Sequence, residues 1–211
     1  MGSTPTSGNI LVATIGTKST VGNFAGYRTV SSISQTGCSW TRQVSKTSFA
    51  TDYFDVEIWF GVVSSGASAS ITITLTGTAT CSVADVCEYS GVLTTGFLDK
   101  TASATGYSNT PQTGTTATTT QANELWIGST IVRVGAAQSN PANGFTLLDG
   151  TNYSSMSLAY LEKIVSSTGQ ASSGTSTAST WDWAGCIATF KASAAPPVGI
   201  ASKRLLVGVG L

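Results

Sequence analysis

The sequence contains no histidine, and this absence removes several kinds of chemistry at once. Histidine is the usual general base beside a serine or cysteine nucleophile, and it is also the commonest metal ligand in proteins. The four cysteines do not follow the spacing of a zinc site. We therefore expect no catalytic triad, no metal centre and no bound cofactor.

Charge is also scarce, because only 9% of the residues are charged and ten basic side chains balance ten acidic ones. No run of Lys or Arg forms the basic stripe that a nucleic-acid partner needs. No stretch approaches the roughly 18 consecutive apolar residues of a membrane-spanning helix, and the N-terminus lacks the features of a secretory signal. We expect neither a nucleic acid nor a membrane as partner.

What the sequence does contain is alternation, because apolar residues recur at every second position while helical spacing is nearly absent. In residues 54–62 the apolar side chains share one face, and in residues 70–78 Ile and Leu alternate with Thr. Stretches rich in Gly, Ser, Asn and Pro, such as 105–114, 148–152 and 166–177, are typical of turns. Further predicted strands span 9–15, 26–33, 38–45, 124–134, 155–164 and 181–192.

These patterns predict an all-β fold in which two antiparallel sheets pack as a β-sandwich. A jelly-roll-like sandwich is the first expectation, and an immunoglobulin-like one is the alternative. The composition changes once, at SAAPPVG, where Pro196 and Pro197 cannot donate the hydrogen bonds of a sheet and so mark a hinge. We predict a flexible N-terminal arm at 1–8, one sandwich domain at 9–194, and the hinge with an extended hydrophobic tail strand at 195–211. No convincing internal repeat is visible.

The C-terminal tail is the best indication of function in the sequence. Its residues alternate between an apolar row and a row bearing two glycines, and glycine inside a strand indicates close packing. Burying the four side chains of the apolar row is worth about 1.5–3 kcal/mol each, before the entropy of ordering is subtracted. Either the tail folds back onto its own sandwich or it adds to a neighbouring subunit, which the hinge favours. The predicted assembly residues are Leu205, Leu206, Val207, Gly208, Val209, Gly210 and Leu211.

Three tryptophans support an alternative function. Trp59, Trp181 and Trp183 are the candidates for glycan contacts if the protein is a carbohydrate-binding or adhesion module. Most tryptophans of a sandwich lie in its core, so this hypothesis needs an exposed ring.

The carboxylates Asp52, Asp55 and Glu57 form the only cluster that resembles a glycosidase pair. Asp55 and Glu57 lie about 7 Å apart on a strand, between the retaining separation and most of the inverting range. The alternation of the strand already explains both acids as an outward polar face, so we do not expect an enzyme.

The four cysteines leave their pairing open. Cys38, Cys81, Cys87 and Cys186 are either buried thiols that act as small apolar side chains, or they form one or two disulfides. On one straight strand Cys81 and Cys87 would lie about 20 Å apart, so these two can pair only across a turn.

The order of several segments resembles a family of β-sandwich domains found in phage virion proteins and in bacterial cell-surface or secreted proteins. The segments are GNILVATIG, CSWTRQVSK, VEIWFGVVSSGASASITITLTGTA, VCEYSGV, TGTTATTTQANELWIGS and WAGCIATFKA. The resemblance spans residues 8 to 192, EYSGV and ELWIG are its most diagnostic motifs, and it carries over no catalytic residue. It implies a scaffold for decoration, adhesion or assembly on a virion or an extracellular surface.

Together these features predict a structural protein that assembles with copies of itself, or docks on other particle proteins, by strand addition. A phage virion component, such as a capsid decoration or tail protein, is the leading context, and an extracellular filament subunit is physically equivalent. The alternative is a carbohydrate-binding or adhesion module with surface glycans as partners.

Overall fold

The computed structural model describes residues 3–20, 27–49, 52–153, 155–193 and 205–208. These residues form strands and connecting turns, and none of them lies in a helix that could cross a membrane. The strands are β1 (Ile10–Thr20), β2 (Val30–Ser34), β3 (Cys38–Phe49), β4 (Asp52–Val63), β5 (Thr72–Leu75), β6 (Cys81–Tyr89), β7 (Leu98–Ser108), β8 (Gln112–Thr118), β9 (Asn123–Val132), β10 (Thr146–Tyr153), β11 (Met156–Ser166), β12 (Gln170–Gly174), β13 (Trp181–Lys191) and β14 (Leu205–Gly208).

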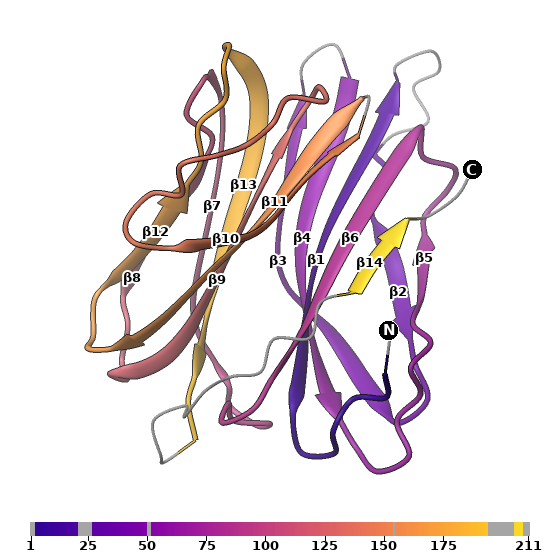
Figure 1. Cartoon of the computed structure of the whole chain (residues 1–211), viewed down its shortest axis with the longest axis vertical. Coiled ribbons are helices and arrows are strands. Elements are labelled where there is room, and N and C mark those ends of the chain that lie inside the picture. The colour runs from indigo at the N-terminus through magenta and orange to yellow at the C-terminus, as the bar shows by residue number, and fades with distance from the viewer. Residues whose placement is uncertain (1–2, 21–26, 50–51, 154, 194–204, 209–211) are drawn as a thin grey trace.

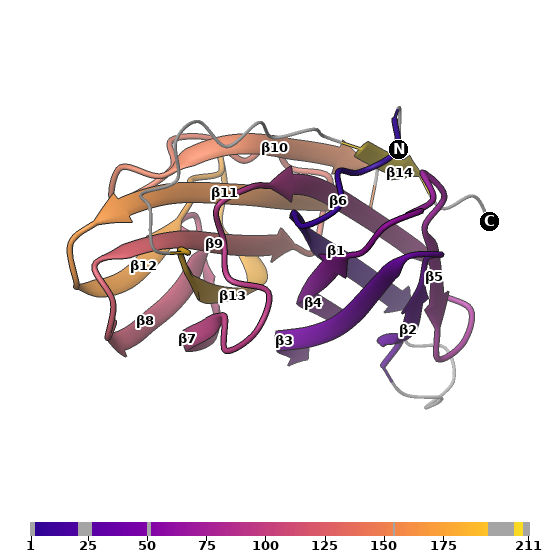
Figure 2. The same ribbon diagram turned by 90° about the horizontal axis from the view of Figure 1, so that it is seen from below.

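Two large antiparallel sheets face each other and form a sandwich (Figure 1 and Figure 2). The first sheet has the strand order β14-β6-β1-β4-β3, and the second has the order β10-β11-β9-β13-β7. Neighbouring strands run antiparallel in both sheets. The predicted all-β, two-sheet antiparallel sandwich is confirmed.

The chain completes most of the first sheet before it begins the second. Strands β1, β3, β4 and β6 belong to the first sheet, and β7, β9, β10, β11 and β13 belong to the second. Among the strands that the structure describes, only β14 lies in a large sheet built from the other half of the chain. This last strand therefore joins the end of the chain to the sheet formed by its beginning.

One apolar core fills the space between the sheets. The alternating apolar residues of β4 from Phe54 to Phe60 point into it, as predicted, and each is at most 1% exposed. Phe60 stacks on Phe97 with ring centroids 3.7 Å apart and also contacts Phe190 of β13. Burying aromatic side chains of this size removes a large apolar area from water, so this core is the main source of stability.

Each large sheet is also apolar on its outer face, where a two-stranded sheet covers it. Strands β2 and β5 cover the first sheet, and their Ile33 and Ile73 pack against a buried cluster that includes Leu11. Strands β8 and β12 cover the second sheet, where Ala171 packs in a cluster with Trp126. The central strands of both large sheets are therefore buried on both faces.

The structure differs from the predicted turns in three places. Strand β7 continues through residues 105–108, β10 occupies residues 148–152, and β12 occupies residues 170–174. These segments are rich in Gly, Ser, Thr and Asn, which resemble turn residues when the sequence is considered alone. Pairing with a neighbouring strand overrides the local preference here, because β propensity depends strongly on tertiary context.

A substitution at Gly185 in β13 tests how closely the second sheet approaches strands β8 and β12, which cover it. A Cβ atom there would overlap the backbone carbonyl of Gln112 in β8. We expect Gly185→Ala to lower the free energy of unfolding by about 1–3 kcal/mol, the usual cost of overpacking. Gly128→Ala is the matched control, because its Cβ would lie 3.0 Å from a side-chain methyl group of Thr113 that can move. Urea denaturation measures both variants, and an equal loss in the two would contradict the backbone contact.

Candidate functional site

The strand β14 is the part of the predicted assembly tail that the structure describes. Leu205–Gly208 pairs antiparallel with Val83–Val86 of β6, at the edge of the first sheet (Figure 1). The hinge residues Pro196 and Pro197 and the tail residues 209–211 lie outside the described residues. Of the two outcomes that the sequence leaves open, the isolated chain adopts the first, because its tail strand completes its own sandwich.

Strand β6 has one edge to which the tail strand can add, because its other edge is already paired. Its other edge pairs with β1 along its whole length, from Cys81 to Tyr89. The side chains of Val83, Ala84 and Val86 are at most 1% exposed. Val83 belongs to the inner core, and the other two belong to the cluster under β2 and β5. A strand added at this edge therefore meets buried apolar positions at Ala84 and Val86 on one face, and Val83 beside the buried Asp85 on the other.

The register of the pairing agrees with the alternation seen in the sequence. Leu205 pairs with Val86, and Val207 pairs with Ala84. Both partners belong to the cluster that β2 and β5 cover. The apolar row predicted for the tail is therefore in register with buried apolar positions of its acceptor strand.

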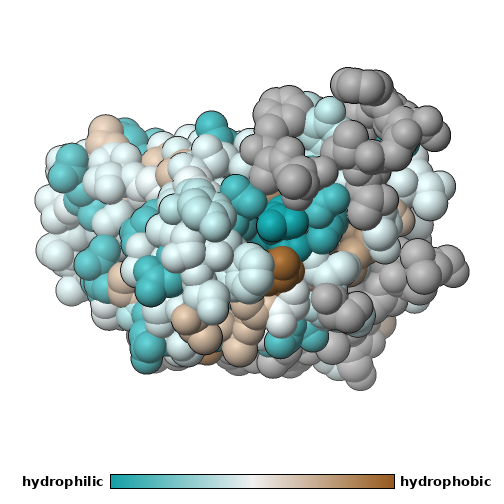
Figure 3. Space-filling model, turned by 90° about the horizontal axis from the view of Figure 1, so that it is seen from above, coloured by the Kyte–Doolittle hydropathy of each residue, from teal (hydrophilic) through white to brown (hydrophobic). Residues whose placement is uncertain are grey.

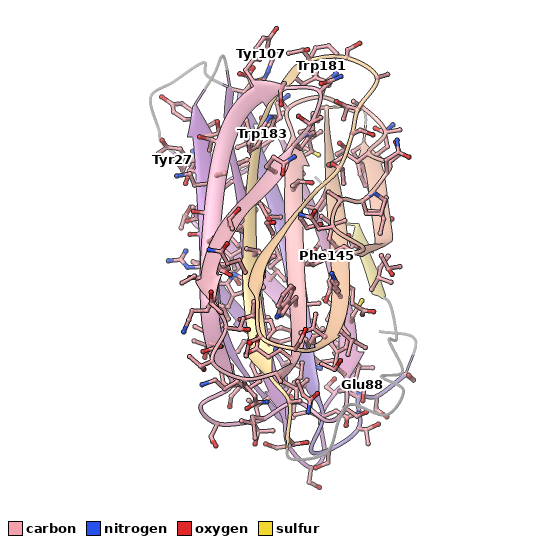
Figure 4. All side chains as sticks on the ribbon, turned by 90° about the vertical axis from the view of Figure 1, so that its left-hand side faces the viewer. Tyr27, Glu88, Tyr107, Phe145, Trp181 and Trp183 are labelled. Carbon is pink, nitrogen blue, oxygen red and sulfur yellow. The ribbon has the colours of Figure 1, made fainter. Side chains whose placement is uncertain are left out.

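The N-terminal arm contacts the same acceptor strand. The backbone N–H of Thr6 donates to Glu88 Oε1 at 2.8 Å, and Asn9 Nδ2 donates to the same oxygen at 2.6 Å. Figure 4 shows Glu88 near the lower end of the molecule. Pro5 is buried, and the N–H of Gly8 donates to a carbonyl in β4. These contacts hold Thr6 and Gly8 against the sandwich, and the flexibility of the arm stays a prediction.

The predicted carboxylate pair lies beneath the cover of the first sheet. Asp55 is 2% exposed and Glu57 is 1% exposed. Glu57 accepts hydrogen bonds from the backbone N–H of Val30 in β2 and from Trp59 Nε1, both at 2.7 Å, and Asp55 accepts one from Thr47. These carboxylates join strands and are closed to a polymeric substrate, so the glycosidase alternative has no accessible acid pair at this position.

A second copy of the Glu–Trp arrangement occurs in the second sheet. The sequence ELWIG at 124–128 repeats EIWFG at 57–61. In each copy the indole N–H donates to the Glu two residues earlier, at 2.7 Å for Trp59 and 2.9 Å for Trp126. Each copy lies in an interior strand beneath a two-stranded cover. The repeat is only five residues long, which is why the sequence pattern alone does not establish it.

Two of the three tryptophans considered for glycan contacts are nearly buried. Trp59 is 8% exposed and Trp183 is 7% exposed, and Trp183 Nε1 donates to Ser108 Oγ at 2.9 Å. Trp181 is half-buried and lies at the same end of the molecule as Tyr107 (Figure 4). Tyr107 is 68% exposed, but it lies in a segment predicted as a turn and is not among the three predicted contact residues.

An ion pair joins the two sheets at this end of the sandwich, because Arg133 Nη1, just after β9, lies 3.7 Å from Asp52 Oδ2 in β4. Lys18 is 7% exposed, and its Nζ lies 3.2 Å from Asp52 Oδ2 and donates to the carbonyl oxygens of Arg133 and Ser155. Arg133 Nε in turn donates to Asp182 Oδ2 at 3.0 Å. Figure 3, which views the molecule from this end, shows a cluster of hydrophilic surface near its centre. The charges pair with each other and with backbone carbonyls, as buried charges require.

All four cysteines are free thiols. Cys81 and Cys87 lie on the same strand, β6, where a bond between them is out of reach. Burial raises the pKa of Cys38 and of Cys87 to about 12, so these thiols stay protonated and unreactive. Within the described residues, no group of three or more Cys, Asp or Glu is placed to hold a metal ion.

The buried Asp55 predicts a specific pH dependence of stability. Burial, together with the charge of Glu57, raises its pKa from the ordinary value of 3.8 to about 8. The folded chain therefore binds more protons than the unfolded chain between these values, and stability falls as the pH rises from about 4 to about 8. Asp55→Asn cannot ionise, so we expect it to flatten this fall and to melt above the parent at high pH.

Each kcal/mol of destabilisation that Asp55→Asn removes should raise the melting temperature by about 2–4 °C. Thr47→Val is the companion variant, because it removes the hydrogen bond that lowers the pKa of Asp55 and should extend the fall to higher pH. Calorimetry across the pH range measures all three proteins. Parallel pH profiles for the parent and Asp55→Asn would contradict the assignment.

Comparison with known proteins gives no identity for this chain. No protein-family model, curated protein or solved structure matches it. Its function is therefore inferred from its own sequence, contacts and geometry.

Proposed function

We propose that this protein is a structural component that assembles with copies of itself, or docks on proteins of a larger particle, by strand addition at β6. The proposed context is a phage virion, in which the protein is a capsid decoration or tail protein. A subunit of an extracellular filament would use a donated strand in the same way. The pairing of Leu205–Gly208 with Val83–Val86 carries this proposal. It supplies a donor strand from one half of the chain and an acceptor edge from the other.

The acceptor edge supports exchange because it is the same in every copy of the chain. Strand β6 is held by β1 along its other edge, whichever tail it receives. A neighbour's tail would form the same backbone hydrogen bonds and meet the same buried positions at Val83, Ala84 and Val86. Such exchange of an identical element is a low-cost route to assembly, and copies held side by side in a particle raise its effective concentration.

An acceptor strand without a donor would be unfavourable. Val83–Val86 would present unpaired N–H and C=O groups at the edge of an apolar sheet, which favours uncontrolled pairing. Any tail that occupies the edge removes this hazard. Donation between copies therefore satisfies the edge and connects the copies in one step.

The length of the chain between the sandwich and the tail also supports exchange. Strand β13 ends at Lys191 in the second sheet, and β14 begins at Leu205 in the first. Extended chain spans about 3.3–3.6 Å per residue, so residues 192–204 are long enough to reach an adjoining molecule. Pro196 and Pro197 favour the extended conformation that such a reach needs.

Removing the tail tests the need for a donor strand. We expect deletion of residues 199–211 to abolish the defined multimers of the parent and to leave a folded chain that associates only irregularly through its bare β6 edge, because the deletion removes β14 and leaves both sheets otherwise complete. Light scattering after size-exclusion chromatography measures the mass, and circular dichroism checks the fold. Val207→Asp keeps the tail length and should weaken assembly in the same direction, since it places a charge opposite Ala84. Unchanged multimers in both variants would contradict strand addition by this tail.

A crosslink between register partners tests exchange directly. Ala84→Cys is introduced in one tagged chain and Val207→Cys in a second chain with another tag, and the two are refolded together and oxidised. Because these positions are opposite each other in the β6–β14 pair, we expect a mixed disulfide on a non-reducing gel. Each variant mixed with the parent is the control for the native thiols. A single chain that carries both substitutions is the comparison. If this chain crosslinks within itself and the mixed pair of single variants does not, exchange between copies is ruled out.

A further inference from the structure

A second pair of acids lies at the end of the sandwich opposite Trp181. Glu124, near the start of β9, is fully buried, and the side chain of Asp99 in β7 is only 3% exposed. Strand β13 lies between β7 and β9, and the two carboxyl groups interact with each other across it. The acids are far apart in the sequence, so only the packing of the second sheet brings them together.

Hydrogen bonds and cations hold Asp99 in its ionised form. The backbone N–H and the hydroxyl group of Thr120 both donate to its carboxylate, the hydroxyl group at 2.7 Å. Lys100 Nζ lies 3.1 Å from Asp99 Oδ1, and Lys191 Nζ lies 3.7 Å from the same oxygen. Burial raises the pKa of Asp99, but the bonds from Thr120 and Lys100 outweigh burial and hold the pKa below the ordinary value of 3.8. Asp99 therefore stays charged at neutral pH.

Glu124 has the opposite environment. Its Oε2 accepts a hydrogen bond from Trp126 Nε1 at 2.9 Å, whereas its Oε1 is buried and accepts none. Burial raises the pKa of Glu124 from 4.5 to about 7, and the neighbouring carboxylate of Asp99 raises this pKa as well. A proton on Glu124 satisfies Oε1, because the carboxylic acid can then donate to Asp99. The geometry therefore favours one proton shared between the two acids.

The other charged groups around this pair are cations. Lys100 lies on β7, Lys191 is the register partner of Glu124 on β13, and Lys163 of β11 lies over the tryptophan that donates to Glu124. Strands β8 and β12 and the connection from β8 to β9, which cover this face, carry no charged residue. Because two of the cations already contact the ionised acid, a further metal cation would be repelled, and a proton is the ligand that fits.

Three parts of the backbone meet at the acid pair. The connection from β8 to β9 bonds to it through Thr120. Strand β13 ends beside it at Lys191, whose N–H donates to the carbonyl of Phe97 at 2.7 Å and whose carbonyl accepts from Leu93 at 3.0 Å. Both of these partners belong to the connection from β6 to β7, which joins the two large sheets. The next N–H, of Ala192, donates to the first residue of β9.

We propose that Asp99, Glu124 and Lys191 form a proton-operated latch at this end of the sandwich. While the two acids share a proton, the latch holds the connection from β8 to β9 against the end of β13. When Glu124 loses this proton, two carboxylates lie together away from water, and local opening hydrates them. The opened form has an ordinary carboxyl group, so opening becomes easier as the pH rises from about 4.5 to about 7 and then levels off. The latch belongs to the folded chain itself and does not depend on the proposed assembly.

Native-state hydrogen exchange of the full chain tests the latch. After correction for the intrinsic exchange rate, we expect the protection of the Thr120, Lys191 and Ala192 amides to fall by up to about tenfold per pH unit between about pH 5 and about pH 7. Glu124→Gln is the matched variant, because its amide can donate to Asp99 as the protonated acid does but cannot ionise. Its protection should not change with pH. Asp55→Asn is the control for the first sheet and should keep the fall at these amides.

Titration of the carboxyl groups by NMR gives a second measurement. Glu124 should titrate near pH 7, and Asp99 should titrate below its ordinary value. Asp99→Asn removes the neighbouring charge, so Glu124 should then titrate at a lower pH and the fall in protection should end earlier. Titration of Glu124 at its ordinary value of 4.5 overturns the proposal, as does the same protection profile in the parent and in Glu124→Gln. Deletion of residues 199–211 should leave these results unchanged, so the latch and the assembly site can fail separately.

Discussion

The central strands of the two large sheets are buried on both faces, and much of the architecture follows from the need to cover them. The sheets cover each other's inner faces, and β2 with β5 and β8 with β12 cover the outer faces. A chain that buries so much of each sheet needs few charged residues, in agreement with a charged fraction of 9%. It also needs glycines such as Gly185, where a cover approaches the backbone of the sheet too closely for a side chain.

Buried carboxylates connect each cover to its sheet or fix the residues beneath it. Glu57 accepts hydrogen bonds from Val30 in the cover and from Trp59 in its own strand. Glu124 accepts one from Trp126, and burial raises its pKa to about 7 despite this bond. An acid at such a position is useful because it can accept several hydrogen bonds where no water reaches, but its charge is unfavourable there. The Glu124 copy of the Glu–Trp motif thus combines a hydrogen bond to its tryptophan with a sensitivity to pH.

Alternation in the sequence was sufficient to predict the sandwich, because residues such as Phe54 to Phe60 show period two without ambiguity. It was not sufficient to predict that the opposite face is also buried. Asp55 and Glu57 fit an outward polar face, and only the long-range packing of β2 and β5 encloses them. The same limit applies to the tail, whose apolar row is visible in the sequence although its acceptor lies in the distant β6. Tyr107 shows no local signal, because its exposure depends on where β7 ends.

The division of the two sheets between the two halves of the chain has a consequence for synthesis. A ribosome adds about 5–20 residues each second, so β6, which ends at Tyr89, emerges several seconds before β14, which begins at Leu205. Throughout that interval a nascent chain carries an acceptor strand and has no donor of its own. The edge of β6 is therefore the last part of the first sheet to be completed, once residues 205–208 have left the ribosome.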